Sequence, residues 1–160
     1  MKRNIMTLLI TVFAMLQATA QTYDNLWKQA DIIAQKDQPK SEIGVMKKII
    51  SKATVAKDYG QLLAAEIRQA ILWREISPDS LTPNVKRMET EALKAKDPVL
   101  KAVRYAVLGK VYREVNGKKS EEFFKKALEQ PELLARNAST GYVPLTLKGV
   151  DGSSFNNDLL

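Results

Sequence analysis

The stretch YAVLGKVYREVNGKKSEEFFKKALEQP, residues Tyr105–Pro131, decides the fold of this chain. Its first half places apolar residues at spacings of three and four: Tyr105, Leu108, Tyr112 and Val115. Its second half carries a further inward-facing set: Phe124, Ala127 and Leu128. Such spacing is typical of one face of a helix. Because only the short Asn116-Gly117 break separates the halves, they predict two helices folded against each other.

The same period runs through most of the remaining chain and predicts an all-α protein. The other expected helices are Tyr23 to Lys36, a stretch after Pro39 ending near Ala56, Gln61 to Ile76, and Thr82 to Lys96. Gly60 and the Ser77–Ser80 segment are expected to separate them, and Ser120 to cap the last helix. The helix Gln61 to Ile76 is apolar over a wide arc, so we expect it to be covered on two sides.

The hairpin Tyr105–Pro131 resembles a tetratricopeptide-type repeat. Leu108-Gly109 followed by Tyr112 is similar to the small-and-aromatic pattern of that repeat's first helix, and Gly109 would let the partner helix come close. The second-helix positions are matched by these residues: Ser120, Phe124, Ala127 and the terminal Pro131. The resemblance implies three antiparallel hairpins stacked in a right-handed arrangement, two of them degenerate. A closed helical bundle is the alternative.

The first twenty residues have the pattern of a secretory signal peptide. Met1 to Arg3 form a charged start, Ile5 to Leu16 are mostly apolar, and Ala18-Thr19-Ala20 offers a small-residue cleavage site. The apolar run is too short for a membrane anchor. We therefore expect export to the periplasm or cell envelope, with three parts: a signal peptide 1–20, a tetratricopeptide-like domain 21–136, and an irregular tail or linker 137–160.

Composition disfavours catalysis and nucleic-acid binding. The 160 residues include no histidine and no cysteine, so the commonest general base, metal ligand and thiol nucleophile are all missing. The net charge is +7, but lysines such as Lys125 and Lys126 alternate with acids such as Glu121 and Glu122 rather than forming a basic stripe. We predict no enzyme activity, no cofactor, and no catalytic, cofactor-binding or metal-site residues.

Aromatic and cationic side chains are the remaining candidates for recognition. The aromatic residues at helical spacing are expected mainly in the core: Trp27, Tyr59, Trp73, Tyr105, Tyr112 and Phe124. Tetratricopeptide stacks commonly hold partners on the concave surface made by their first helices. Three cationic residues are candidates for that surface: Arg68, Arg104 and Lys110.

The opening YDNLWKQADIIAQKDQPKSEIGVMKKIISKATVAKDYGQLLAAEIRQAI and the end ALEQPELLARNASTGYVPLTLKGVDGSSFNNDLL carry a second resemblance. They are similar to the N-terminal helical region of the exported alpha-2-macroglobulin-like proteins of Bacteroidetes-type bacteria. That resemblance implies an accessory helical module of a larger exported protein. With no cysteine, the chain cannot form the thioester found in some members of that family.

Two functions follow as hypotheses. The first is a non-catalytic exported helical-repeat module that binds a protein partner or docks against downstream domains of its own polypeptide. The alternative is a free-standing small periplasmic binding or structural protein for an acidic envelope ligand, which predicts a clustered basic surface. Neither hypothesis includes nucleic acid or a membrane span after signal cleavage, and the oligomeric state is left open.

Overall fold

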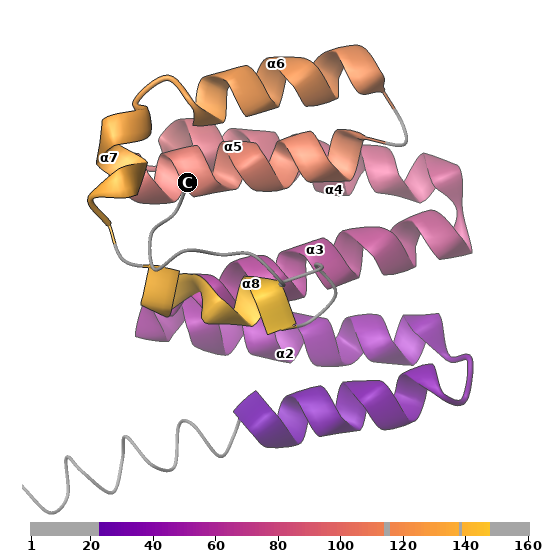
Figure 1. Cartoon of the computed structure of the whole chain (residues 1–160). Coiled ribbons are helices and arrows are strands. Elements are labelled where there is room, and N and C mark those ends of the chain that lie inside the picture. The colour runs from indigo at the N-terminus through magenta and orange to yellow at the C-terminus, as the bar shows by residue number, and fades with distance from the viewer. Residues whose placement is uncertain (1–22, 114–115, 138, 148–160) are drawn as a thin grey trace, which may run out of the picture.

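The computed structural model describes residues 23–113, 116–137 and 139–147, and this part of the chain is helical with no β-strand (Figure 1). A helix over residues 23–34 is followed by α2 (Pro39–Ala56), α3 (Tyr59–Ile76), α4 (Pro78–Lys94), α5 (Pro98–Tyr112), α6 (Gly117–Ala127), α7 (Pro131–Ala135), the 3-10 helix η1 (Ser139–Tyr142) and α8 (Val143–Leu147). The all-α prediction is confirmed. The predicted signal peptide, residues 1–20, lies outside the described residues.

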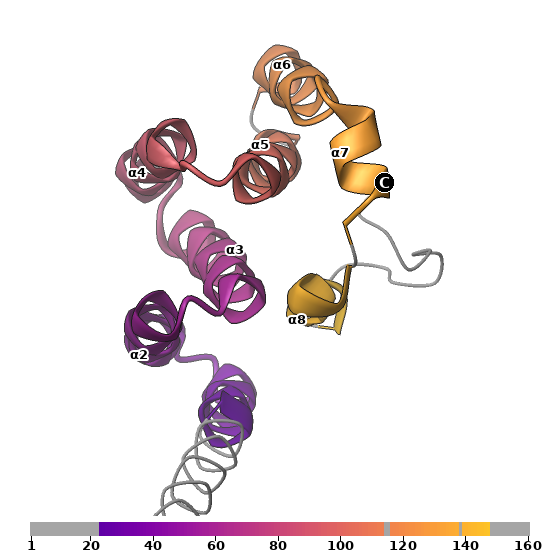
Figure 2. The same ribbon diagram turned by 90° about the vertical axis from the view of Figure 1, so that its left-hand side faces the viewer.

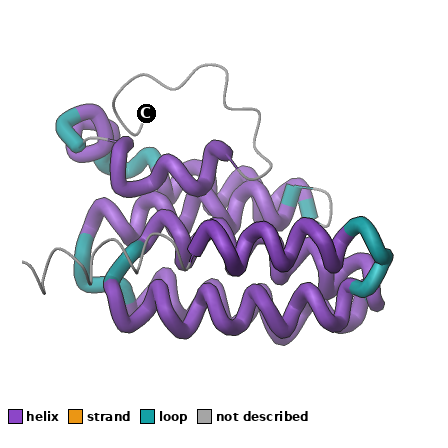
Figure 3. Tube along the Cα trace, turned by 90° about the horizontal axis from the view of Figure 1, so that it is seen from below, coloured by secondary structure: helices purple, strands orange, loops and turns teal. Residues whose placement is uncertain are grey.

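The long helices form an open stack of antiparallel hairpins. Figure 3 shows these helices running back and forth, joined by short loops. Figure 2 looks along the helix axes and shows successive helices arranged in a zigzag. Each helix from α2 to α5 packs on the next one in sequence, and α3 also packs on α5. Within the described residues, α2 does not pack extensively on α4, α5 or α6, as it would in a closed bundle. The stacked arrangement is therefore the correct one of the two predicted.

Two hydrophobic clusters form the core, and α3 contributes to both. Met46 and Ile49 of α2 are fully buried in the first cluster, with Leu62 of α3. The adjacent Leu63 belongs to the second cluster, together with Leu108 of α5. Successive residues of a helix point about 100° apart, so neighbours can serve different layers. The prediction that this helix is covered on two sides is confirmed.

The α5–α6 hairpin has the close approach expected at Gly109. A Cβ atom at this position would lie 2.8 Å from the ring of Phe124, so the ring occupies the space that any larger residue would need. The Ser120 hydroxyl donates a hydrogen bond of 2.7 Å to the Gly109 carbonyl oxygen and ties the two helices together. Ser120 is thus a buried residue inside α6, and the helix cap is Asn116, whose side chain accepts from the Lys119 N–H at 3.0 Å.

The inward face of α6 also differs from the prediction. Phe123 is the buried aromatic residue, stacked on Tyr105 and Tyr112 with ring centroids 6.0 and 5.6 Å apart. Phe124 is 38% exposed and Leu128 is 54% exposed. Of two adjacent phenylalanines only one can point fully inward, and the position of α5 decides which.

Three predicted boundaries are wrong. Gly60 lies inside the first turn of α3, which Asp58 caps by accepting from the Gln61 N–H at 3.2 Å. Helix α4 begins at Pro78, so Pro83 lies inside it, where the missing N–H removes one intrahelical hydrogen bond. Pro131 begins α7 rather than ending α6. In the predicted irregular tail, 137–160, the described residues 139–147 are helical.

Candidate functional site

A segment from the end of the described chain lies across the helical stack. The 3-10 helix η1 and α8 both pack on α3. In Figure 2 α8 lies on the side of α3 that faces away from α2 and α4, next to the row formed by helix 23–34, α3 and α5. These are the first helices of the three hairpins, whose common face is the concave surface predicted to hold partners. The structure therefore shows a short piece of the same polypeptide packed on α3, the middle helix of that face.

Gly60 makes the contact possible. A Cβ atom on Gly60 would collide with the carbonyl oxygen of Gly141 and lie 2.9 Å from Cδ of Pro144. A residue with a side chain would therefore have to push the segment away from α3. The absence of a side chain at Gly60, which suggested a helix break in the sequence, serves close packing of two backbones instead.

Two apolar side chains anchor the segment. Leu145 is half-buried and packs against both hydrophobic clusters, as does Tyr59 at the start of α3. Tyr142 packs against the second cluster. Burial, and then the negative charge of Asp97, raise the pKa of the Tyr142 phenol to about 12, so this side chain is neutral over the physiological range. Leu145 thus connects the two halves of the core from the outside.

The two arginines predicted for the concave surface are held in ion pairs. Arg68 Nε lies 2.7 Å from Glu42 Oε1, and this hydrogen bond raises the pKa of the Arg68 guanidinium. Arg104 is buried and pairs with Glu66 at 3.0 Å. Both acids are buried, so the arginines neutralise charges inside the protein and are not available as free ligand-binding groups. Lys110, by contrast, is exposed.

The predicted aromatic residues are mainly structural. Trp27 and Tyr105 are buried, and the Trp27 indole donates a 2.7 Å hydrogen bond to Gln61 of α3. The Tyr112 hydroxyl donates to Glu89 at 2.7 Å, and Lys119 donates to the same carboxylate at 3.0 Å. Burial alone would raise the pKa of Glu89, but these two hydrogen bonds outweigh it and hold that pKa below its ordinary value.

Acidic side chains elsewhere in the chain, which could in principle bind a metal ion, form local ion pairs instead. Glu121 and Glu122 form separate ion pairs with Lys125 and Lys126, one turn along α6. Among the described residues, no three acidic side chains gather in a way that could hold a metal ion. Asp151 and Asp158 lie outside the described residues. No described helix is both long and apolar enough to cross a lipid bilayer.

Sequence reasoning missed the residues that form the concave-face contact. Gly141, Tyr142, Pro144 and Leu145 fall in the stretch predicted as irregular, because its three glycines and one proline hide any helical period. The apolar run Tyr142-Val143-Pro144-Leu145 was the available signal, since such a run needs a surface to cover it. Comparison with protein-family models, with curated proteins and with solved structures finds no match to this chain.

Proposed function

We propose that the chain is a non-catalytic helical-repeat module that holds polypeptide segments on the face formed by helix 23–34, α3 and α5. One observation carries the proposal: residues Gly141 to Leu145 lie on α3, with Gly60 and Tyr59 shaped to receive them. A helical surface that accommodates a short apolar segment of its own chain has the shape and chemistry to hold a similar segment of another.

In the native setting the proposal is an exported module that docks neighbouring parts of a larger polypeptide, or a separate protein. The resemblance to the N-terminal helical region of alpha-2-macroglobulin-like proteins supports this form of the proposal. So does the signal-like sequence at residues 1–20, which would send the module to the periplasm or cell surface. The segment on α3 lies in the stretch that would lead from the module toward any following domains.

The test separates the segment from its surface while keeping the full chain. Leu145→Glu places a charge against the apolar surface and should detach the segment. A synthetic peptide of residues 139–147 is then added, and NMR shifts are followed at Gly60 and Tyr59. We expect binding to the Leu145→Glu chain and much weaker binding to the wild type, whose own segment competes at an effective concentration on the order of millimolar.

The matched control is the same peptide with Tyr142 and Leu145 replaced by serine. It should bind neither chain, since the two anchoring side chains are gone. Two results with the Leu145→Glu chain would contradict the proposal. One is equal NMR shifts from the unmodified and the serine-substituted peptide; the other is no shift in α3 with the unmodified peptide at several millimolar. Circular dichroism should show that the Leu145→Glu chain keeps its helices.

A further inference from the structure

A groove runs along the opposite face of the stack, between α2 and α4. Its floor comes from α3 and its walls from the two flanking helices; the residues that line it include Lys47, Ile50, Ser51, Gln69, Trp73 and Arg87. In Figure 2 the α2 and α4 side of the stack is the side away from α8. This groove, here called the α2–α4 groove, is thus separate from the surface that holds the chain's own segment.

Gln69 is the most informative residue of the groove. It is 5% exposed, yet its side-chain amide has no hydrogen-bond partner within the described part of the chain. Among the described residues, the Tyr23 hydroxyl is the one fully buried side-chain polar atom without a partner, so the Gln69 amide is open to water on the groove side. Since Gln69 lines the groove, a ligand lying there could satisfy it. The amide carries both donors and an acceptor, and therefore matches a peptide group.

The walls of the groove are positively charged. Lys47 forms no ion pair with any described residue, and the single acid of α2, Glu42, is buried and committed to Arg68. Arg87, on the opposite wall, uses one nitrogen to reach Glu66 at 3.2 Å, but its side chain is 42% exposed. A guanidinium has five N–H donors, so most of them can still bind an anion.

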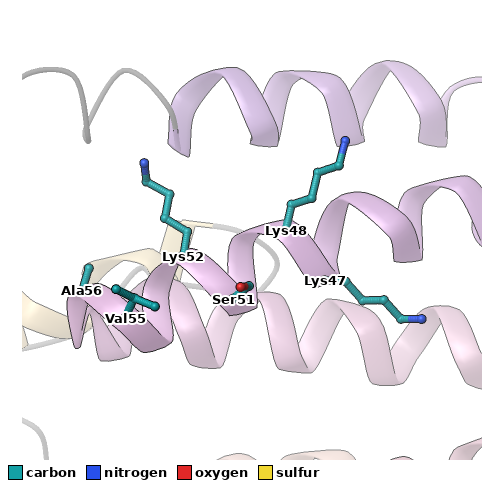
Figure 4. Close-up of a pocket in the computed structure, with 6 residues that line it drawn as sticks. All are labelled: Lys47, Lys48, Ser51, Lys52, Val55 and Ala56. Carbon is teal, nitrogen blue, oxygen red and sulfur yellow. The ribbon is translucent and has the colours of Figure 1, made fainter.

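The positive surface continues around α2. Figure 4 shows Lys48 and Lys52 on one side of the helix and Lys47 directed to the other side, with Ser51 between them. Neither Lys48 nor Lys52 has an acidic partner among the described residues; the Lys52 ammonium lies over the Tyr23 ring instead. Lysines on α6 are different, because Lys125 and Lys126 each pair with an acid of the same helix. Helix α2 thus presents three lysines, Lys47, Lys48 and Lys52, without an acidic partner among the described residues.

We infer that the α2–α4 groove binds an acidic segment of a partner protein. Carboxylates of that segment pair with Lys47 and Arg87, a main-chain amide bonds to Gln69, and an apolar side chain lies on Trp73. An anionic polymer would use only the cations and leave the Gln69 amide and the Trp73 ring without a function. Amide, ring and cations together thus favour a polypeptide over a polyanion.

The test uses a synthetic peptide of three Glu-Glu-Leu repeats with blocked ends, added to the full chain and followed by NMR. The Gln69 side-chain amide and the Trp73 indole should shift, while Gly60 should not. Lys47→Gln with Arg87→Gln should weaken binding about tenfold, the combined effect of two partly exposed ion pairs. Lys125→Gln with Lys126→Gln removes the same charge from α6 and should leave affinity unchanged.

Gln69→Met tests whether the groove recognises the main chain of the peptide or only attracts its negative charge. Methionine has a similar shape and no unpaired amide, so the chain should be as stable as the wild type and should bind the peptide several-fold more weakly. The inference is overturned if Gln69→Met leaves affinity unaltered, if the α6 double variant loses as much affinity as the groove variant, or if a Gln-Gln-Leu peptide binds equally well. It is also overturned if inorganic polyphosphate displaces the peptide and shifts Gln69 and Trp73 in the same way.

Discussion

Gly60 lies directly against the main chain of Gly141, with no space between them for a Cβ atom. The contact joins two parts of the sequence that are far apart, the first turn of α3 and the end of η1. It is also the point where the segment Gly141 to Leu145 touches α3, so a substitution here is the most direct way to separate the two.

Gly60→Ala should release the segment from α3 without unfolding the stack. The new methyl group would collide with Gly141, and the weakly anchored segment should move rather than the long helix. Hydrogen exchange at Tyr142 to Leu145 is expected to become faster, while exchange in α5 stays slow. The matched control is Gly44→Ala in α2, where a Cβ would meet nothing within 4 Å and the helix should gain about 1 kcal/mol. Unchanged protection at Tyr142 in the Gly60→Ala chain would show that the contact does not hold the segment.

Alkaline titration should detect the burial of Tyr142. Its pKa is raised from 10.0 to about 12, so the folded state keeps the phenol neutral where the unfolded state would lose the proton. The resulting stabilisation is complete below pH 10 and is lost as the pH rises through about 12. Tyrosinate absorbance of wild type minus Tyr142→Phe should give a late transition, which moves toward pH 10 in the Gly60→Ala chain. A difference curve centred near pH 10 in the wild type would contradict this placement.

Glu66→Gln should be strongly destabilising. The Glu66 carboxylate accepts from Arg104 at 3.0 Å and from Arg87 at 3.2 Å, and Arg104 is buried. Removing the negative charge leaves the Arg104 guanidinium uncompensated in the interior, at a cost of about 3 kcal/mol or more. Glu121→Gln, which breaks an exposed ion pair on α6, is the control and should barely change stability. Urea unfolding followed by circular dichroism compares the two variants.

Gly109→Ala should strain the α5–α6 hairpin, because its methyl group would lie 2.8 Å from the Phe124 ring. We expect a loss of about 1–3 kcal/mol in the free energy of unfolding, typical of overpacking. Adding Phe124→Ala should reverse most of this effect, since the double variant has room for the methyl group. Losses that simply add in a double-mutant cycle would show that the two positions are not in contact.

Apolar spacing made most helices predictable, but it left their ends and their exact faces open. The inward positions Val85, Met88 and Ala92 of α4 are buried as their spacing predicts. Its start was placed too late, because Thr82-Pro83 has the same local pattern as a helix cap. Likewise, Ser120 has the chemistry of a cap but lies inside α6, where its hydroxyl bonds to Gly109. Local sequence cannot distinguish these uses of one residue type.

The candidate surfaces were much less predictable than the helices. The contact on the concave face joins α3 to a segment about eighty residues later in the chain, and loops and turns carry little periodic signal to mark such a contact. The proposal for the α2–α4 groove depends on the Gln69 amide facing the groove without a hydrogen bond inside the described part of the chain, a property of three-dimensional packing alone. The lysines of α2 were visible in the sequence, but their lack of acidic partners was not.

The sequence by itself determined that this chain is all-α, because the spacing of apolar side chains fixes which face of each helix must leave water. It also determined the close helix approach at Gly109. Whether the helices form an open stack or a closed bundle was decided by the tertiary structure. The tertiary structure decided which of Phe123 and Phe124 enters the core, why Gly60 must be a glycine, and what covers the face of α3. These depend on contacts between residues far apart in the chain, and local spacing carries no information about them.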